Sequence, residues 1–276
     1  MKFTKMHGCG NDYVYLDCTH QLPEDPSALS RQVSDRHFGI GSDGLILIAA
    51  SDKADFRMII YNSDGSEASM CGNGIRCVGK FVYDKGLTSK TKLTIETKSG
   101  IKLLNLNVRD GKVDSVQVDM GEPCLTAASI PVVGMGDPVI EHPIHVQGQD
   151  FLMTCVSMGN PHAILWTEDT AHCGLETIGP QLEHDPMFPD RCNIEFVQIL
   201  DSNSIRMRVW ERGAGETQAC GTGSCACAYA CYVTGKTGSS VRVHLLGGEL
   251  DIAYDPDTRH MLMTGPAVTV FEGELV

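Results

Sequence analysis

Hydrophobic and polar positions alternate over short stretches along most of the chain, and glycines separate these stretches. Such alternation is typical of β-strands. In the first half it predicts the strands Phe3–Asp17, Leu45–Ala50, Phe56–Tyr61, Lys92–Thr97, Ile101–Val108 and Val113–Asp119. In the second half it predicts Ala163–Trp166, Ile194–Leu200, Ile205–Trp210, Val241–Leu246, Glu249–Tyr254, and Met261 with Val268–Phe271. Strands are therefore expected to dominate.

Four segments have the pattern of a helix instead. Ser27–Phe38 starts with a serine and continues as an amphipathic stretch, and Leu175–Leu182 is a weaker example of the same pattern,. The other two begin at cysteines: Cys71 to Lys85, followed by a glycine, and Cys220 to Thr234, followed by a glycine,. The pattern thus predicts two helices that each start at a cysteine.

An internal repeat relates the two halves of the chain. Cys220 follows Cys71 by 149 positions, and the same offset pairs Gly10-Asn11 with Gly159-Asn160, Glu67 with Glu216, Gly72 with Gly221, Gly74 with Gly223, and Asn62 with Glu211. Chance matches among common glycines are the alternative, but Asn, Glu and Cys join the match. A duplicated unit predicts two similar lobes whose equivalent loops meet at one cleft.

Composition and charge narrow the class of protein. The chain has 276 residues, 42% of them hydrophobic and 21% charged, which is typical of a soluble globular protein of one or two domains,. A net charge of -13 would repel a phosphate backbone, so we expect no nucleic-acid partner,. No stretch approaches the roughly 20 apolar residues that span a bilayer. We therefore expect no membrane partner and a cytoplasmic protein.

Twelve cysteines leave three interpretations open. A disulfide framework is typical of small secreted chains. A metal site would need paired ligands, and the densest group, Cys220, Cys225, Cys227 and Cys231, matches no familiar spacing,. The third interpretation is that most thiols pack in the interior while one or two are reactive. We favour the third.

The two helices that start at cysteines indicate acid–base chemistry. A cysteine at a helix N-terminus lies near the positive end of the helix dipole, which predicts a lowered pKa and a populated thiolate. Gly72, Gly74, Gly221 and Gly223 leave room for a ligand close to both N-termini, where a carboxylate can bind,. An amino acid held there would have its α-carbon between two sulfurs. Proton removal on one face and return on the other inverts the stereocentre.

The motifs around these residues resemble those of diaminopimelate epimerases over essentially the whole chain. The segments concerned are His7–Asp12, Asn62–Glu67, Cys71–Gly74, Gly159–His162 and Glu211–Gly221, the last reading E-R-G-A-G-E-T-Q-A-C-G. The resemblance implies an α/β (α+β) fold with two pseudo-symmetric lobes, each a mostly antiparallel sheet wrapped around a central helix, and an active site in the cleft between them. The expected lobes are residues 1–119, completed by a C-terminal strand at 265–276, and residues 120–264.

The resemblance also implies an activity. It is the conversion of LL-diaminopimelate to the meso form, in lysine and peptidoglycan precursor biosynthesis, without pyridoxal phosphate, metal or any other cofactor. Cys71 would be the proton donor and Cys220 the acceptor in that direction. We further expect a homodimer.

Site residues follow from the resemblance position by position. Backbone groups of Gly72, Asn73, Gly221 and Thr222 would hold the reacting carboxylate, and His162 and Glu211 would influence the cysteines. Contacts to the rest of the substrate would come from Asn11, Asn62, Asn160, Asn193, Glu211 and Arg212. One departure is Gly44, where many family members have glutamine, so a side-chain contact is expected to be missing.

Several alternatives stay open. His162 could be a hydrogen-bonded core histidine, although its place in G-N-P-H favours a functional role. Glu67 and Glu216 are expected to cap turns, and Cys77, Cys225, Cys227 and Cys231 to pack inside helices. Two other functions compete with an epimerase: a proline or hydroxyproline racemase, against which Arg212 argues, and a thiol-based metal or redox-sensing protein.

Overall fold

Two series of strands, each with one long central helix, make up most of residues 1–275, which the computed structural model describes. The chain divides into two units. Unit 1 consists of Met1–Asp119 together with the C-terminal segment from Thr264, and unit 2 of Met120–Met263. The sequence had placed the second boundary one residue later, after position 264.

Unit 1 contains two helices, the first eight strands of the chain and the last strand. Its helices are α1 (Pro26–Ser34) and α2 (Gly72–Asp84). Its strands are β1 (Lys2–Gly8), β2 (Asn11–Cys18), β3 (Gly44–Ala49), β4 (Phe56–Asn62), β5 (Glu67–Ala68), β6 (Lys92–Thr97), β7 (Gly100–Arg109), β8 (Lys112–Gly121) and β18 (Val268–Glu274). The last two residues of β8 belong to unit 2.

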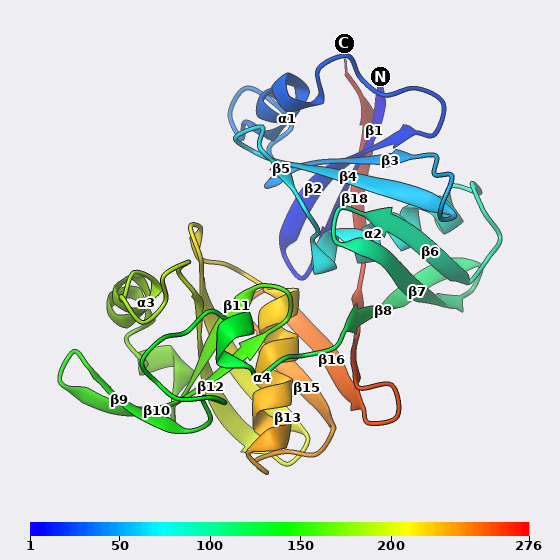
Figure 1. Cartoon of the computed structure of the whole chain (residues 1–276). Helices are drawn as coiled ribbons and strands as arrows, with labels where there is room; N and C mark the ends of the chain where they lie inside the picture. The colour runs from blue at the N-terminus through cyan, green and yellow to red at the C-terminus, as the bar shows by residue number, and fades with distance from the viewer. Residues whose placement is uncertain (276) are drawn as a thin grey trace. The chain divides into compact units, whose positions relative to one another are not determined.

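The strands of unit 1 pair in the order β18, β1, β2, β3, β4, β6, β7, β8. The β2–β3 and β4–β6 pairs are parallel and the others antiparallel. Helix α2 packs against β1, β2 and β7 (Figure 1). Ten of its 13 residues are buried, which fits a helix surrounded by its own sheet rather than one lying on a surface.

Unit 2 repeats this arrangement. Its helices are α3 (Leu175–Glu183) and α4 (Gly221–Val233), with two short 3-10 turns, η1 (Ala127–Ser129) and η2 (Thr170–His172). Its strands are β9 (His142–Val146), β10 (Gln149–Ser157), β11 (Pro161–Trp166), β12 (Asn193–Asp201), β13 (Ser204–Glu211), β14 (Gly215–Glu216), β15 (Ser240–Leu245), β16 (Gly248–Asp255) and the first part of β17 (His260–Pro266).

The strands of unit 2 pair in the order β9, β10, β11, β12, β13, β15, β16, with β11–β12 and β13–β15 parallel. Helix α4 contacts all of these strands except β9 (Figure 1). Its buried face is made of small residues, chiefly alanine and cysteine. Small side chains let a helix approach a sheet closely on every side, so the cysteines there act as packing residues.

The duplication is visible element by element. Both ends of α4 lie 149 residues after the ends of α2, and both ends of α3 lie 149 residues after those of α1. Strand register follows the same offset, because Tyr13 pairs with Gly44 across β2–β3 and His162 with Asn193 across β11–β12. The two-lobe α/β fold expected from the sequence is therefore confirmed, and the repeat is not a coincidence of glycines.

Several elements differ from the prediction, among them one helix and one hairpin. Helix α1 starts after Asp25, whose carboxylate accepts the Ala28 N–H at 2.9 Å, and it ends at Ser34 rather than Phe38. It stops there because the Asp35 carboxylate accepts the N–H groups of the next turn,. The hairpin β9–β10 was not predicted at all.

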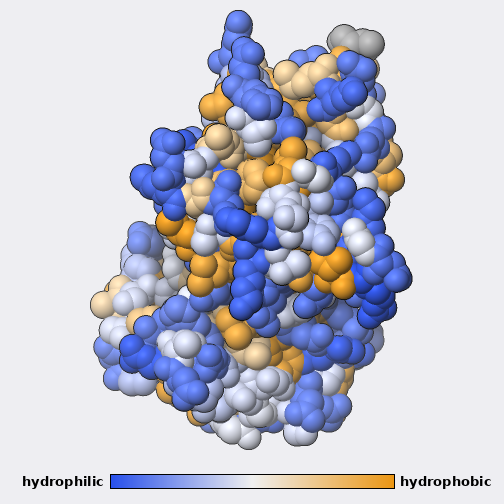
Figure 2. Space-filling model, turned by 90° about the vertical axis from the view of Figure 1, so that its right-hand side faces the viewer, coloured by the Kyte–Doolittle hydropathy of each residue, from blue (hydrophilic) through white to orange (hydrophobic). Residues whose placement is uncertain are grey.

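The surface is mixed in polarity. Figure 2 shows groups of hydrophobic residues among hydrophilic ones on the face that it draws. Within residues 1–275, no helix is both long enough and apolar enough to cross a membrane.

Candidate active site

The two cysteines singled out by the repeat occupy the same position at the start of equivalent helices. Cys71 is the N-cap of α2 and Cys220 the N-cap of α4, both with extended backbone. The Sγ of Cys71 accepts the Gly74 N–H at 3.3 Å, and the Sγ of Cys220 accepts the Gly223 N–H at 3.3 Å. A sulfur thus takes the part that a serine or aspartate oxygen usually has, and each sulfur lies at a helix N-terminus.

The second glycine of each C-G-x-G motif lies in a closely packed place. A Cβ on Gly223 would lie 2.8 Å from Oε1 of Glu195 and 3.2 Å from the Cys220 sulfur. A Cβ on Gly74 would lie 2.7 Å from Cδ1 of Ile46. Both distances are shorter than carbon contacts normally allow, so the helix starts could not form unchanged with a larger residue.

Cys71 is held by a polar chain within unit 1. Its thiol donates to Oδ1 of Asn11 at 3.2 Å. The amide of Asn11 donates in turn to Asp43 at 2.8 Å, and Asp43 accepts from Arg36 at 2.9 Å. The orientation of the Asn11 amide is therefore fixed, with its oxygen toward the sulfur.

Cys220 is held by a different chain within unit 2. Its sulfur lies 3.5 Å from the Thr222 hydroxyl, which accepts from the amide of Asn160 at 3.2 Å. Oδ1 of Asn160 is 3.2 Å from Nε2 of His162, and Nδ1 of His162 is 2.6 Å from Oε1 of Glu195. The repeated asparagines, Asn11 and Asn160, thus belong to the hydrogen-bond chain of the cysteine in each unit. Their further partners differ: Asp43 for Asn11, and Thr222 and His162 for Asn160.

The expectation of a lowered thiol pKa is wrong for Cys220. Burial raises its pKa well above the usual value, and the carboxylates of Glu211 and Glu195 raise it further. Hydrogen bonds from Thr222 and from the Gly223 N–H lower it but do not outweigh burial,. These two hydrogen bonds are thus the contacts that favour the thiolate of Cys220, against burial and the two carboxylates.

A second group of predicted residues lies where β12 starts and β13 ends: Asn193, Glu211 and Arg212. The buried Asn193 side chain donates to the carbonyl of Pro161 at 2.7 Å and accepts the backbone N–H of Arg212 at 2.9 Å. The guanidinium of Arg212 is exposed and donates to the Asp190 carbonyl at 3.0 Å. Among the described residues, no carboxylate forms an ion pair with it, so it can bind an anion. Glu211 accepts a hydrogen bond from Thr217.

The remaining predicted residues lie near the start of α2 and α4 or on the strand beside Gly44. Gly72, Asn73 and Gly221 are buried in the first turns of the helices. Asn62 donates to Ser66 at 3.0 Å and pairs with Gly44 across β3–β4. Asn62 is thus held in its own turn.

The structure gives a steric reason for glycine at position 44, which the sequence does not reveal. A Cβ at this position would lie 2.1 Å from the carbonyl oxygen of Tyr61 on the neighbouring strand and 2.9 Å from the ring of Tyr13. Because backbone cannot yield as a side chain does, this strand pair requires glycine. A glutamine at this position would need a different local backbone, so its absence here is a property of the β3–β4 pair.

The structural alternatives are resolved residue by residue. Glu67 and Glu216 form ion pairs with Lys98 at 2.6 Å and Arg208 at 2.7 Å. Cys77, Cys225, Cys227 and Cys231 are buried, as predicted. Burial raises the pKa of Cys77 to about 11 and that of Cys231 to about 12, which makes them inert,.

Three residues near the cysteines were missed. They are Asp43 and Glu195, described above, and Tyr13, whose pKa is raised well above its usual value by burial and by Cys71 and Asp43. The 149-residue offset pairs Tyr13 with His162, and that signal was available in the sequence. Asp43 and Glu195 gave no such signal, because the offset pairs them with Cys192 and Ile46.

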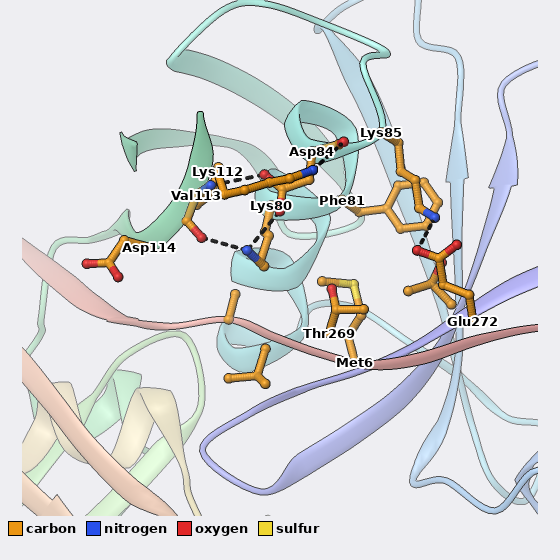
Figure 3. Close-up of a pocket in the computed structure, with 13 residues that line it drawn as sticks. Met6, Lys80, Phe81, Asp84, Lys85, Lys112, Val113, Asp114, Thr269 and Glu272 are labelled. Atoms are coloured by element: carbon orange, nitrogen blue, oxygen red, sulfur yellow. Dashed lines mark hydrogen bonds and ion pairs between the residues drawn. The ribbon is translucent and has the colours of Figure 1, made fainter. Parts of the chain in front are cut away.

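A surface groove in unit 1 lies away from the cysteine. It is lined by residues of the C-terminal half of α2, including Lys80 and Asp84, and by parts of β1, β8 and β18 (Figure 3). Helix α2 has 13 residues, so its two ends are about 20 Å apart. Lys80 pairs with Asp84 at 2.8 Å, so this charge is already neutralised. The groove is thus separate from the Cys71 site.

Among the described residues, no group of three or more His, Cys, Asp or Glu side chains is arranged to hold a metal ion.

Comparison with known proteins gives a consistent result. The family model described as diaminopimelate epimerase matches residues 3–126 and 154–270. The chain is 58% identical to the diaminopimelate epimerase of Agathobacter rectalis, covering 100% of this chain and 99% of the relative. It is 57% identical to that of Methanococcus maripaludis strain S2, covering 100% and 99%.

Solved structures share the fold at low identity. A PhzF-family phenazine biosynthesis protein from Bacillus anthracis has a TM-score of 0.73 at 19% identity, covering 100% of this chain and 99% of the other. A hydroxyproline epimerase from Agrobacterium vitis has a TM-score of 0.69 at 16% identity, covering 100% and 90%. With the match over most of its length and relatives above 50% identity, the chain belongs to the diaminopimelate epimerase family of isomerases.

Proposed function

We propose that this chain converts LL-2,6-diaminopimelate to the meso form by a two-base proton transfer between Cys71 and Cys220. The names of its full-length relatives support this substrate. The observation that carries the mechanism is the pair of cysteines at equivalent helix N-termini, where both sulfurs accept a backbone N–H and only Cys71 also donates to an asparagine oxygen. In this proposal the sulfurs act on opposite faces of one α-carbon, and the reaction uses only side chains and backbone of the chain.

The hydrogen bonds around the sulfurs support a division of roles. Cys71 donates to the oxygen of Asn11, and only the protonated thiol can do so,. Each sulfur accepts a backbone N–H, from Gly74 and Gly223, but Cys220 can also accept from the Thr222 hydroxyl, and such bonds favour a thiolate. The first arrangement suits a proton donor and the second a proton acceptor, in the LL to meso direction. In reverse the roles exchange.

The reacting carboxylate would bind at the two helix N-termini. The first turns of α2 and α4, at Gly72, Asn73, Gly221 and Thr222, have backbone N–H groups that no residue within the helix can satisfy,. Such groups attract an anion and hold it without reorganisation. Negative charge that develops on the carboxylate side of the α-carbon would be stabilised there, while His162 and Glu211 adjust the cysteine environment.

The other end of the substrate is an amino acid that does not react. We propose that Arg212 binds the distal carboxylate. The other contacts to this end of the substrate would come from Asn11, Asn62, Asn160, Asn193 and Glu211. Two observations support this role: the guanidinium of Arg212 is exposed, and the backbone N–H of Arg212 is held by the Asn193 side chain. A planar guanidinium can bind both carboxylate oxygens at once.

Lysine at position 212 should keep the charge and lose the two-pronged geometry. A charge-assisted hydrogen bond contributes about 1.5–3 kcal/mol, so we expect kcat/KM of Arg212→Lys to fall about tenfold to a hundredfold, mainly through KM. Steady-state kinetics with LL-diaminopimelate measure this. Arg206→Lys, an exposed arginine on β13, is the matched control. Unchanged kcat/KM in Arg212→Lys would make Arg212 a structural residue.

Purified protein incubated with LL-diaminopimelate in heavy water tests the proposed function. The returned proton comes from a thiol that exchanges with solvent, so the meso product should carry deuterium at the inverted α-carbon. L-Proline and hydroxyproline serve as comparison substrates. Inversion of these and not of diaminopimelate would replace the proposal with a racemase of the kind found among the solved relatives, and meso product without deuterium would exclude exchange through thiols.

We also propose a homodimer that works in the cytoplasm and binds no nucleic acid. Strand β18 exposes Val268, Val270 and Phe271, which are 39%, 54% and 45% accessible, and an apolar strand face of this kind suits a second copy. Twelve cysteines as thiols suit a reducing compartment,. A net charge of -13 disfavours binding to phosphate backbones,.

A further inference from the structure

Behind the Cys220 site lies a buried pair of ionisable side chains, Glu195 of β12 and His162 of β11. Both side chains have zero accessibility, and Oε1 of Glu195 is 2.6 Å from Nδ1 of His162. The other carboxyl oxygen, Oε2, is buried and has no hydrogen-bond partner among the described residues. Neither the family comparison nor the sequence motifs assign a role to Glu195.

Counting protons restricts the state of this pair. Nε2 of His162 faces Oδ1 of Asn160 at 3.2 Å, and an amide oxygen can only accept, so Nε2 carries a hydrogen. The 2.6 Å contact on the other side also needs one proton, because two lone pairs would repel. The pair is therefore either an imidazolium with a carboxylate or a neutral imidazole with a neutral carboxylic acid.

The surroundings favour the neutral pair. An ionised carboxylate with one oxygen left without a partner in the interior is costly. Burial raises the pKa of Glu195 and Glu211 raises it further, while His162 lowers it. The other ionisable groups that Glu195 influences are thiols, which bring no positive charge: Cys155, Cys192, Cys220 and Cys227.

We propose that Glu195 is a positioning residue that acts as a neutral carboxylic acid, donating from Oε1 to Nδ1 of His162 and holding that ring with its Nε2–H on Asn160. The inference rests on the proposed role of Cys220. It concerns the orientation of the groups around the sulfur, and Glu195 itself exchanges no proton with substrate.

The consequence is a hydrogen-bond chain with one direction. Glu195 donates to His162, His162 to Asn160, Asn160 to Thr222, and the Thr222 hydroxyl is left to donate to the Cys220 sulfur at 3.5 Å. Donors aligned in series polarise one another. The chain therefore ends in a donor aimed at the atom that must carry negative charge when Cys220 removes a proton.

Among the described residues, unit 1 lacks the acid–imidazole pair that begins this chain. The positions equivalent to Glu195 and His162 are Ile46 and Tyr13, and the Cys71 thiol donates to Asn11 besides accepting the Gly74 N–H. Only Cys220 therefore lies at the end of such a hydrogen-bond chain, which fits the different roles proposed for the two sulfurs.

Two substitutions of Glu195 test the proposal. Glutamine has an amide N–H where the acid has its O–H, so Glu195→Gln should retain kcat within about threefold, whereas Glu195→Leu, which removes the donor, should lower kcat about tenfold to a hundredfold with KM little changed. Glu96→Gln, a half-buried carboxylate of unit 1 that accepts from Ser51, is the control. An equal loss in Gln and Leu would mean that the carboxylate form is needed, and full activity in Leu would mean that Glu195 has no role.

A second measurement does not depend on activity or on the folding of Glu195→Leu. In protein labelled with ¹⁵N-histidine, the His162 signals, assigned by their loss in His162→Asn, should show a neutral ring protonated at Nε2. An imidazolium, or a ring protonated only at Nδ1, would overturn the proposal. If the expected ring state is found in a protein that does not epimerise diaminopimelate, the proposed function fails and the positioning role stands.

Discussion

Alanine in place of Cys220 should lower kcat for diaminopimelate epimerisation about a thousandfold or more in both directions, and Cys71→Ala should do the same. Each sulfur is proposed to serve one face of the α-carbon, so losing either one interrupts the transfer. A positioned acid or base contributes about 10²–10⁴-fold to a rate. Steady-state kinetics in both directions, started from LL or meso substrate, measure the loss.

Cysteines of the same helices provide the controls. Cys227→Ala and Cys77→Ala alter fully buried thiols that lie one and a half turns or more from the helix start. They should lower Tm and leave kcat within about threefold, because they affect packing and not proton transfer. Near-normal turnover in Cys71→Ala or Cys220→Ala would exclude the two-base mechanism, whatever the controls do.

The second large effect is expected at Gly223. A Cβ there meets the carboxyl of Glu195 at 2.8 Å and the Cys220 sulfur at 3.2 Å, and neither group can move without breaking hydrogen bonds. Overpacking of this kind costs about 1–3 kcal/mol of unfolding free energy, and displacement of the sulfur should lower kcat at least about tenfold. Denaturant unfolding and steady-state kinetics of Gly223→Ala measure the two effects.

Gly74→Ala is the matched comparison in unit 1. Its Cβ meets the terminal Cδ1 of Ile46 at 2.7 Å and stays 3.5 Å from the Cys71 sulfur. Ile46 can change rotamer, so we expect a cost below about 1 kcal/mol and a smaller loss of kcat. Both variants gain the same helix propensity, so the difference between them isolates the contact with Glu195. Equal effects would mean that the two helix starts are packed alike.

Much of the fold could be predicted because the same pattern of strands and helices occurs in both halves of the chain. Helices α2 and α4 start after Cys71 and Cys220, and the glycines that follow them mark their ends. The hairpin β9–β10 was missed because its two-residue turn, Gln147-Gly148, has positive φ at both positions, and glutamine is not a residue that signals such a turn. The start of helix α1 was placed one residue late, at Ser27, because Asp25 caps it and Pro26 is its first residue.

The site was less predictable than the fold, for reasons of burial. A cysteine at a helix N-terminus predicts a lowered pKa only while solvent or a positive charge is near, and Cys220 is buried beside Glu211 and Glu195,. Glu195 itself stands in N-I-E-F-V, where a charged residue normally marks the exposed side of a strand. This strand lies beside the central helix and is buried on both faces from Asn193 to Val197, so alternation could not identify the acid.

The pairing of β18 with β1 has a consequence for synthesis. Unit 2 is one continuous segment, whereas the sheet of unit 1 is closed by β18, which is translated after all of unit 2 and hydrogen-bonds along almost the whole of β1. On the ribosome, β1 can pair with β2 early, but its other edge waits for β18 through the translation of about 260 residues, while unit 2 can already be folded,. The Cys71 half is completed after the Cys220 half, so a chain that stalls before β18 would have a complete unit around Cys220 and an incomplete one around Cys71.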